Sequence, residues 1–272
     1  MPPTPPTPVR VQLLSDLHLE FIEQEGPGAV NRFFDSLDPE GVDVLVLAGD
    51  ITRAGRIHTD LSRFANLYGS VGADVVYVPG NHEYYGTYWW KVNKAIAKVE
   101  AEHENLHSLG VAAMRDVRGL RFVGGTLWFP KPDPDTLTAG RWGMSDFRLI
   151  ADFEPWVYGA NAACVKVIEA HAAEADVIVT HHLPSEQCIA REFQSSPLNP
   201  FFVHDMTPLI ERDQPPLWLY GHTHAPQEHQ IGKTRLICNP KGYPGERHGL
   251  HRDPFNAKLV IEVTPKARKD TP

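Results

Sequence analysis

The chain has 272 residues, of which 42% are hydrophobic and 22% charged, and its formal net charge at pH 7 is −8. This composition is typical of a soluble globular protein, and no window approaches the roughly eighteen uninterrupted apolar residues that indicate a membrane span. The acidic balance argues against a broad nucleic-acid surface, which usually needs a basic face, although bound divalent cations can reverse the local field.

The N-terminal segment MPPTPPTP lacks the basic and apolar regions of a secretory signal, and its prolines predict a disordered arm over residues 1–8. We therefore expect a cytoplasmic protein. The three cysteines stand at wide, unpatterned spacing, which is typical of reduced thiols and indicates neither disulfides nor a zinc knuckle. After the arm we expect one domain over 9–264 and a charged C-terminal tail over 265–272.

The first half of the chain alternates strand and helix patterns. Apolar residues at helical spacing predict helices over 59–69 and 87–103. Continuous apolar runs between them are typical of strands buried on both faces, and the strand, helix, strand order predicts a largely parallel sheet. The predicted strands of this half cover residues 9–15, 43–48, 74–78, 111–117 and 120–128.

The second half has one helical pattern, over 158–174, followed by strands without strong helices between the last of them. These predicted strands cover 176–180, 216–220, 234–238 and 257–263. A mixed or antiparallel sheet fits this half, so the whole chain predicts an α/β fold, a four-layer αββα sandwich of two mixed sheets flanked by helices. Segments 129–157 and 184–215 are predicted long loops with functional roles.

Several predicted strands end in side chains that can bind metals. Because the carboxyl ends of parallel strands meet at one edge of a sheet, we expect these side chains to lie together. Polar groups gathered at such an edge normally cost stability, which indicates a shared metal cluster. The predicted ligands are Asp16, His18, Asp50, Asn81, His181, His222 and His224.

Seven oxygen and nitrogen ligands are too many for one tetrahedral zinc, but they can serve two adjacent ions bridged by a carboxylate, for which Asp50 is the natural choice. The glycines before Asp50, Asn81 and His222 are expected to let the backbone approach the metals without a Cβ clash. Such ligands accept divalent manganese, iron, zinc, nickel or cobalt, and we favour manganese.

The blocks D-x-H, G-D, G-N-H-E, a lone histidine and G-H-x-H occur in this order over residues 16–224. This ordered set resembles the calcineurin-like metallophosphoesterase superfamily. The resemblance implies the αββα fold and hydrolysis of phosphate esters by in-line attack of a metal-bound hydroxide. It also implies two ligand sets that share Asp50. They are Asp16, His18, Asp50 and His224 for one ion, and Asp50, Asn81, His181 and His222 for the other.

His82 matches the family's histidine that is not a metal ligand, so it is expected to give a proton or hydrogen bond to the leaving oxygen. Glu83 is expected to hold the loop or the imidazole of His82. Arg53 stands where protein Ser/Thr phosphatases carry the second aspartate of G-D-x-V-D-R-G, so the carboxylate that orients their histidine is missing. The chain looks closer to compact bacterial-type phosphoesterases, which share phrases such as SDLHLEF and VPGNHEYY.

Candidate substrate-binding residues each have a structural interpretation as well. Tyr84 is the best candidate for stacking on a nucleobase or aryl group, although aromatic residues at that position are more often core. Arg148 could pair with a phosphate through its planar guanidinium group, and Lys241 is a second phosphate candidate. His204 could reach substrate from a long loop. His182 is expected to pack beside the site and not to bind metal.

The sequence therefore predicts an enzyme, a binuclear phosphodiesterase or phosphomonoesterase acting on a small soluble phosphoester, with nucleotides among the options. A nuclease or nucleic-acid end-processing enzyme is the second hypothesis, and the charge of −8 argues against it without excluding it. A non-catalytic scaffold is the third, but such a protein should have lost ligands or His82. The pattern does not name the substrate or the oligomeric state.

Overall fold

The computed structural model describes residues 7–246 and 255–268, and its eleven strands form two sheets. The first sheet contains β1 (Val9–Leu14), β2 (Val44–Ala48), β3 (Asp74–Val78), β4 (Leu106–Ser108) and β11 (Val260–Val263). The second contains β5 (Ala113–Val117), β6 (Leu120–Gly125), β7 (Val177–Thr180), β8 (Leu217–Tyr220), β9 (Gln227–Ile231) and β10 (Thr234–Cys238).

Both sheets are mixed. The first has the order β11-β1-β2-β3-β4, in which only β11 is antiparallel to its neighbour. The second has the order β5-β6-β7-β8-β10-β9, in which the two edge strands are antiparallel and the inner four are parallel. Strands β4 and β9 were not predicted, because β4 has three residues and β9 is a polar edge strand.

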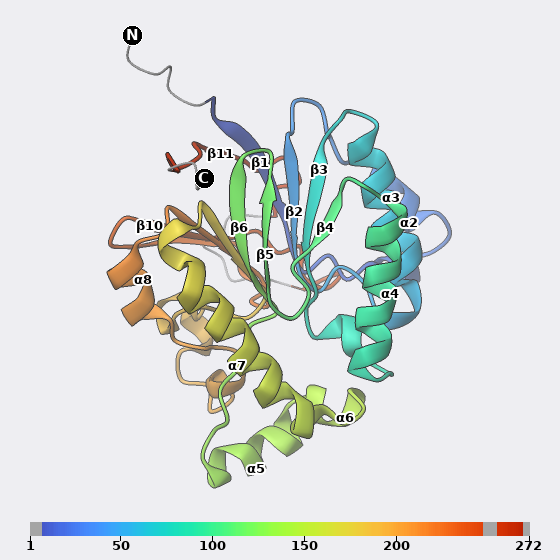
Figure 1. The fold of residues 1–272 in the computed structure, drawn as a ribbon. Helices are drawn as coiled ribbons and strands as arrows, with labels where there is room; N and C mark the ends of the chain where they lie inside the picture. Colours follow the sequence, from blue (N-terminus) through green and yellow to red (C-terminus); the bar gives the residue numbers. More distant parts are fainter. Residues whose placement is uncertain (1–6, 247–254, 269–272) are drawn as a thin grey trace.

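Helices cover the outer face of each sheet (Figure 1). The helices over the first sheet are α2 (Ala29–Asp35), α3 (Ile57–Gly69) and α4 (Trp89–Glu102). Those over the second are α7 (Phe153–His171) and α8 (Thr207–Asp213). The remaining helices are α1 (Leu19–Ile22), α5 (Pro134–Gly143) and α6 (Asp146–Leu149). The predicted αββα sandwich is therefore confirmed.

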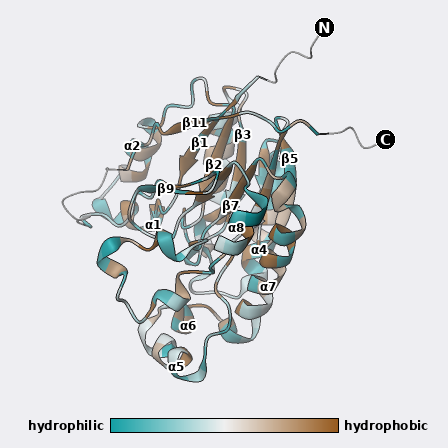
Figure 2. Ribbon diagram, turned by 90° about the vertical axis from the view of Figure 1, so that its left-hand side faces the viewer, coloured by the Kyte–Doolittle hydropathy of each residue, from teal (hydrophilic) through white to brown (hydrophobic). Residues whose placement is uncertain are grey.

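The strand pleat divides the buried side chains between three apolar layers. Along β2, Val44, Val46 and Ala48 pack between the sheets, whereas Leu45 and Leu47 pack against the helices. Figure 2 shows the hydrophobic residues gathered on the strands, with hydrophilic stretches on the surrounding helices and loops. Because both faces of the inner strands are buried, they read as the continuous apolar runs seen in the sequence.

The two segments predicted as long loops contain regular structure, so that prediction is partly wrong. Segment 129–157 contains α5, α6 and the start of α7, and segment 184–215 contains three 3₁₀ turns and α8. Helix α5 forms because Asp133 accepts hydrogen bonds from the N–H groups of Asp135 and Thr136, and Pro134 occupies the first helical position. The sequence did not predict α5, because its apolar residues show only a weak helical periodicity.

Parts of the predicted arm and tail, residues 1–6 and 269–272, lie outside the described residues. The described tail residues 265–268 contact the body of the domain. The Lys266 N–H donates to Asp176 Oδ1 at 2.7 Å, and the Arg268 guanidinium group also pairs with this buried carboxylate. Within the described ranges, no helix is both long enough and apolar enough to cross a membrane.

Replacing Phe122 with alanine should lower the free energy of unfolding by about 3–5 kcal/mol, because its ring is fully buried between the two sheets. Denaturant unfolding followed by tryptophan fluorescence would measure the loss. Trp142 is 82% exposed, so Trp142→Ala is the control and should change stability by less than about 0.5 kcal/mol. Equal losses of stability in the two variants would contradict the placement of Phe122 in the apolar layer between the sheets.

Candidate metal centre

The predicted ligands converge at the edge where the strands of both sheets end. Asp16 and His18 follow β1, Asp50 follows β2, and Asn81 follows β3. His181 follows β7, and His222 and His224 follow β8. Among the described residues, three groups have ligand atoms within 4.8 Å of one another. They are Asp16 with His18 and His224, Asp50 with His181 and His222, and His18 with Asp50 and His82.

Four of these residues have a left-handed backbone, with φ of 48° at Asp16, 47° at His18, 52° at Asp50 and 67° at His222. Non-glycine residues seldom adopt this conformation, and each instance costs on the order of 1–3 kcal/mol unless the surroundings impose it. Backbone hydrogen bonds at 2.9 Å from Asp16 N to Gly49 O and from His18 N to Asp50 O tie the first two loops together. The chain thus reverses sharply at the strand ends and presents its side chains inward.

Glycine at positions 49 and 80 is required by the close approach of these loops. A Cβ at Gly80 would lie 2.2 Å from Asp50 Oδ1, and one at Gly49 would lie 2.2 Å from His181 Nδ1. We expected these glycines to bring the backbone near the metals. The structure shows that they bring one loop against the ligand side chain of the next.

Hydrogen bonds at the outer ring nitrogens orient two of the histidines. His181 Nδ1 lies 3.0 Å from Ala48 O, so this nitrogen carries the proton and Nε2 presents its lone pair to the site. His224 Nδ1 lies 2.6 Å from Glu246 Oε2, which leaves its Nε2 facing inward in the same way. Such outer partners fix the tautomer that metal binding needs.

The inward nitrogens face each other in pairs. The Nε2 atoms of His18 and His224 lie 3.0 Å apart, and His181 Nε2 lies 3.1 Å from His222 Nδ1. Burial lowers the pKa of His18 to about 3, and burial followed by neighbouring imidazoles lowers the pKa values of His181 and His222 well below the usual value. Although burial opposes it, the hydrogen bond to Glu246 raises the pKa of His224. The converging ring nitrogens of these four histidines suit shared cations.

The carboxylates are also placed for a cation. Burial raises the pKa of Asp16 to about 6. Burial, with the charges of Glu83 and Asp16, raises the pKa of Asp50 well above its usual value. Asp16 Oδ2 is buried without a hydrogen-bond partner among the described residues. Ionised carboxylates in this setting are unfavourable unless a cation compensates them, so the donor set fits divalent metals.

The amide of Asn81 is held by Asp146. Asn81 Nδ2 donates to Asp146 Oδ1 at 2.9 Å and to the Tyr85 hydroxyl at 2.8 Å, and Tyr85 donates to the same carboxylate oxygen. Asn81 Oδ1 then lies 3.1 Å from His181 Nε2, on the metal side. Sequence reasoning missed Asp146, because it lies 65 residues from Asn81 with no motif around it.

His82 lies at the same edge, and both of its ring nitrogens have partners. Nδ1 lies 3.0 Å from Glu20 Oε1, and Nε2 lies 3.1 Å from the Tyr243 hydroxyl. Although burial opposes it, contact with His18 and His82 lowers the pKa of Glu20 to about 2, so the carboxylate is ionised. Glu20 thus gives His82 a carboxylate partner. Protein Ser/Thr phosphatases have an aspartate for this role where the present chain has Arg53. Sequence reasoning missed Glu20, although it stands two residues after His18.

Glu83 holds neighbouring loops together. Its two carboxylate oxygens accept hydrogen bonds at 2.7–3.2 Å from four backbone N–H groups. The donors are Asp50, Ile51, Thr52 and Gly80. This network joins the loop after β2 to the loop after β3 and fixes the position of Asp50.

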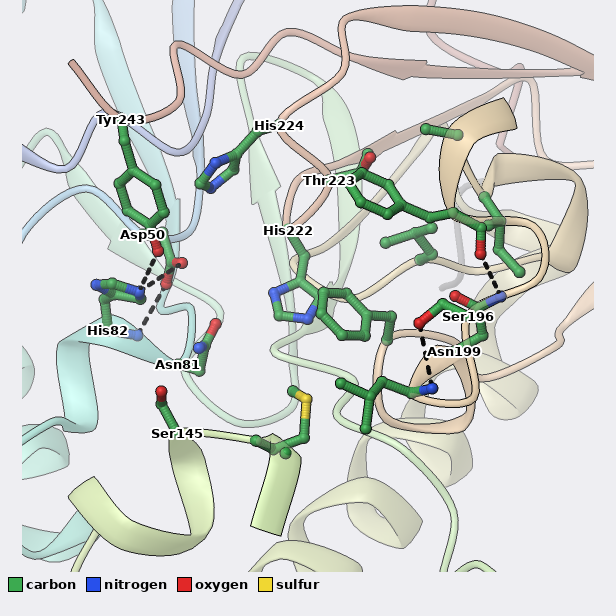
Figure 3. Close-up of a pocket in the computed structure, with 18 of the residues that line it drawn as sticks. Asp50, Asn81, His82, Ser145, Ser196, Asn199, His222, Thr223, His224 and Tyr243 are labelled. Atoms are coloured by element: carbon green, nitrogen blue, oxygen red, sulfur yellow. Dashed lines mark hydrogen bonds and ion pairs between the residues drawn. The ribbon is translucent and has the colours of Figure 1, made fainter. Parts of the chain in front are cut away.

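A pocket of about 380 Å³ opens beside the cluster, and Asp50, Asn81, His82, His222 and His224 line one side of it (Figure 3). Tyr85 and Tyr243 also line it. His182 packs behind this surface, with its ring centroid 4.2 Å from that of His222.

The four candidate substrate-binding residues do not line this pocket. Tyr84 is fully buried against Trp128 and Trp156, so the prediction that it stacks on substrate is wrong. The 3₁₀ turn at 82–84 turns Tyr84 into the core and leaves Tyr85 at the pocket.

The other three candidates have partners or positions elsewhere. Exposed Arg148 donates to Trp142 O at 2.6 Å, and His204 Nδ1 lies 2.7 Å from Asn161 Nδ2. Lys241 is half-buried outside the pocket lining.

Comparison with known proteins gives the following similarities. A family model described as calcineurin-like phosphoesterase matches residues 9–226. The uncharacterized protein L509 of Acanthamoeba polyphaga mimivirus is 24% identical over an alignment of 285 positions, which covers 93% of this chain and 96% of that protein.

Two solved structures are similar in fold. The phosphopantetheinyl hydrolase PptH from Mycobacterium tuberculosis aligns with a TM-score of 0.72 and 19% identity over 98% of this chain and 99% of that one. The protein TT1561 of Thermus thermophilus aligns with a TM-score of 0.52 and 16% identity over 87% and 90% of the two chains. At these identities the likeness concerns the fold alone.

Adding Mn²⁺ to metal-free protein should raise its thermal unfolding midpoint, because the ion relieves the buried carboxylates and paired imidazoles only in the folded state. At about a hundred times the dissociation constant, a bound ion adds about 2.7 kcal/mol. Calorimetry would measure the shift. Asp50→Asn should remove most of it, whereas Asp35→Asn, on the exposed face of α2, should retain it. A full shift in Asp50→Asn would contradict the placement of the site.

Asp146→Ala should weaken Mn²⁺ binding about 10–100-fold, because it frees the Asn81 amide that the carboxylate orients. Titration calorimetry would measure the affinity. Asp146→Asn keeps an acceptor oxygen at the same place and should bind more tightly than the alanine variant. If the two variants bound Mn²⁺ like the unmodified protein, the orienting role of Asp146 would be wrong.

Proposed function

Because the chain belongs to the calcineurin-like phosphoesterase family, whose model matches residues 9–226, we propose that it hydrolyses small phosphoesters at a centre of two metal ions. Membership in the family makes it a metal-dependent hydrolase of phosphoester bonds. We propose in addition that two ions bind, that specific residues hold them and assist the reaction, and that the substrate is small. The observation that carries this proposal is the position of Asp50 between two groups of histidines.

Asp50 turns one carboxylate oxygen toward each group. Its Oδ2 lies 3.9 Å from His18 Nε2, and its Oδ1 lies 3.5 Å from His181 Nε2. This arrangement suits a bridging carboxylate. We assign one ion to Asp16, His18, Asp50 and His224, and the other to Asp50, Asn81, His181 and His222. When bound, such a pair of ions polarises the phosphate oxygens and lowers the pKa of a water, and manganese is our first choice among the divalent metals.

His82 is the proposed source of a hydrogen bond or proton for the leaving oxygen. It lines the pocket, and its Nε2 lies 3.9 Å from Asp50 Oδ2, next to the proposed metals. Glu20 accepts from Nδ1–H and so fixes the ring. With that bond in place, Nε2 accepts from the Tyr243 hydroxyl when the imidazole is neutral and donates when it is protonated.

A nuclease remains the competing proposal. Proteins that bind nucleic acid chains follow the phosphate backbone with lysine and arginine side chains. Among the described residues that line the pocket there is neither lysine nor arginine, and the chain carries a net charge of −8. These observations support a small substrate, either a monoester or a diester.

His82→Ala should reduce the turnover of phenyl phosphate or diphenyl phosphate in the presence of Mn²⁺ about 10²–10⁴-fold, because phenolate is a poor leaving group that needs a proton. Steady-state kinetics would measure the loss. The matched p-nitrophenyl substrates have a good leaving group and should lose much less. Glu20→Gln should give a smaller loss than His82→Ala for the phenyl substrates.

Two results would count against these assignments. An equal loss for phenyl and nitrophenyl substrates would show that His82 does not assist the leaving group. Absence of hydrolysis of every monoester and diester by protein that demonstrably binds Mn²⁺ would contradict the proposed function itself.

A further inference from the structure

The pocket beside the metal centre has a second side of different character. Beyond the metal-side residues, and apart from Gly143 and Glu246, its described lining is mostly apolar. The apolar residues are Met144, Leu183, Ile189, Ala190, Phe193, Leu198 and Phe202, and the small polar residues are Ser145, Ser196, Asn199 and Thr223. In Figure 3, His222 stands between the side that carries Asp50 and His82 and the side that carries Ser196 and Asn199. We call the second side the apolar subsite.

The apolar subsite begins at a proposed metal ligand. The ring of Phe202 packs on that of His222, with centroids 4.5 Å apart and an interplanar angle of 34°. A phosphoryl group held at the proposed metals would therefore place the organic part of its ester next to this wall. The pocket volume of about 380 Å³ falls within the range of sites that enclose a small organic ligand.

Tertiary packing fixes the walls of the apolar subsite. A Cβ at Gly143 would lie 2.8 Å from Leu198, and one at Gly140 would lie 2.1 Å from Phe201, so the end of α5 packs directly on the 3₁₀ turn Asn199–Phe201. Asn199 Nδ2 donates to Phe193 O at 2.8 Å, which ties the segment carrying Phe193 to the same turn. Segments 129–157 and 184–215 thus pack together and form one continuous, well-packed surface.

The charged side chains of the pocket lining restrict the class of ligand further. The described lining contains the carboxyl groups of Asp50 and Glu246 and, as noted, neither lysine nor arginine. A second phosphate on the organic group would meet apolar side chains and give up its hydration without a charged partner. An uncharged apolar group instead gains from burial against these side chains.

We propose that the apolar subsite binds the organic group of the substrate and that the preferred substrates carry one phosphoryl group esterified to an uncharged, apolar alkyl or aryl chain. This inference rests on the proposed function, because it assumes that the phosphoryl group lies at the metals. Phe193 and Leu198 are the residues assigned to select the chain. Phe193 is 52% exposed at the pocket, so it can be changed with little effect on folding.

Methylphosphonate and hexylphosphonate test the proposal without hydrolysis. Both carry the same anionic head, and titration calorimetry on Mn²⁺-loaded protein would compare them. We expect hexylphosphonate to bind at least about tenfold more tightly, because each buried methylene adds affinity. Phe193→Ser and Leu198→Asn should reduce this ratio by weakening hexylphosphonate binding. Trp142→Ser is the matched control, since Trp142 is an exposed aromatic residue outside the pocket lining.

Equal affinity for the two phosphonates would overturn the apolar subsite while leaving the metal centre intact. A ratio that survives Phe193→Ser and Leu198→Asn, or that falls as much in Trp142→Ser, would overturn the assignment of the subsite to these walls. If Mn²⁺-loaded protein bound neither phosphonate, the phosphate site of the proposed function would itself be wrong, and the subsite proposal would fall with it. The absolute affinity for methylphosphonate therefore separates the two failures.

Discussion

The burial of several carboxylates beside inward-facing imidazoles is the constraint on which the site depends. In a water-excluded setting these groups repel or remain protonated, so the fold must force them together. The left-handed backbone at Asp16, His18, Asp50 and His222 and the four N–H groups that bind Glu83 are the means by which it does so. The apolar layers of the sandwich supply the rigidity that holds this unfavourable arrangement in place.

The proposed roles divide between the parts of the molecule that hold metals and the parts that shape the substrate. Ligands stand directly after strands, where packed sheets fix their positions. The pocket wall comes from two segments, the one that contains α5 and α6 and the one that contains the 3₁₀ turns at 186–201. The two segments pack on each other. One element belongs to both parts, since Asp146 on α6 orients the amide of Asn81. Changes in the wall near Asp146 can therefore reach the metal side.

The fold and the convergence of the seven residues could be predicted because each residue follows an apolar strand within a short motif. Glu20, Asp146 and Tyr243 could not be predicted with roles, because their contacts with His82 or Asn81 depend on tertiary packing. The choice between Tyr84 and Tyr85 depended on the direction of a single 3₁₀ turn, which no periodicity reveals. Helix α5 was missed because its capping signal is strong but its apolar pattern is weak.

The division of the ligands between the two sheets has a mechanical consequence. Each proposed ion takes ligands from both sheets, such as Asp16 after β1 and His224 after β8, which lie far apart in the sequence. Bound ions would therefore cross-link the two sheets at one end of the sandwich. At the opposite end, Lys266 and Arg268, which follow β11 of the first sheet, pair with Asp176 at the start of β7 of the second. Without bound metal the cross-link through the ions would be absent, so we expect local opening of the sandwich to begin at the end where catalysis is proposed.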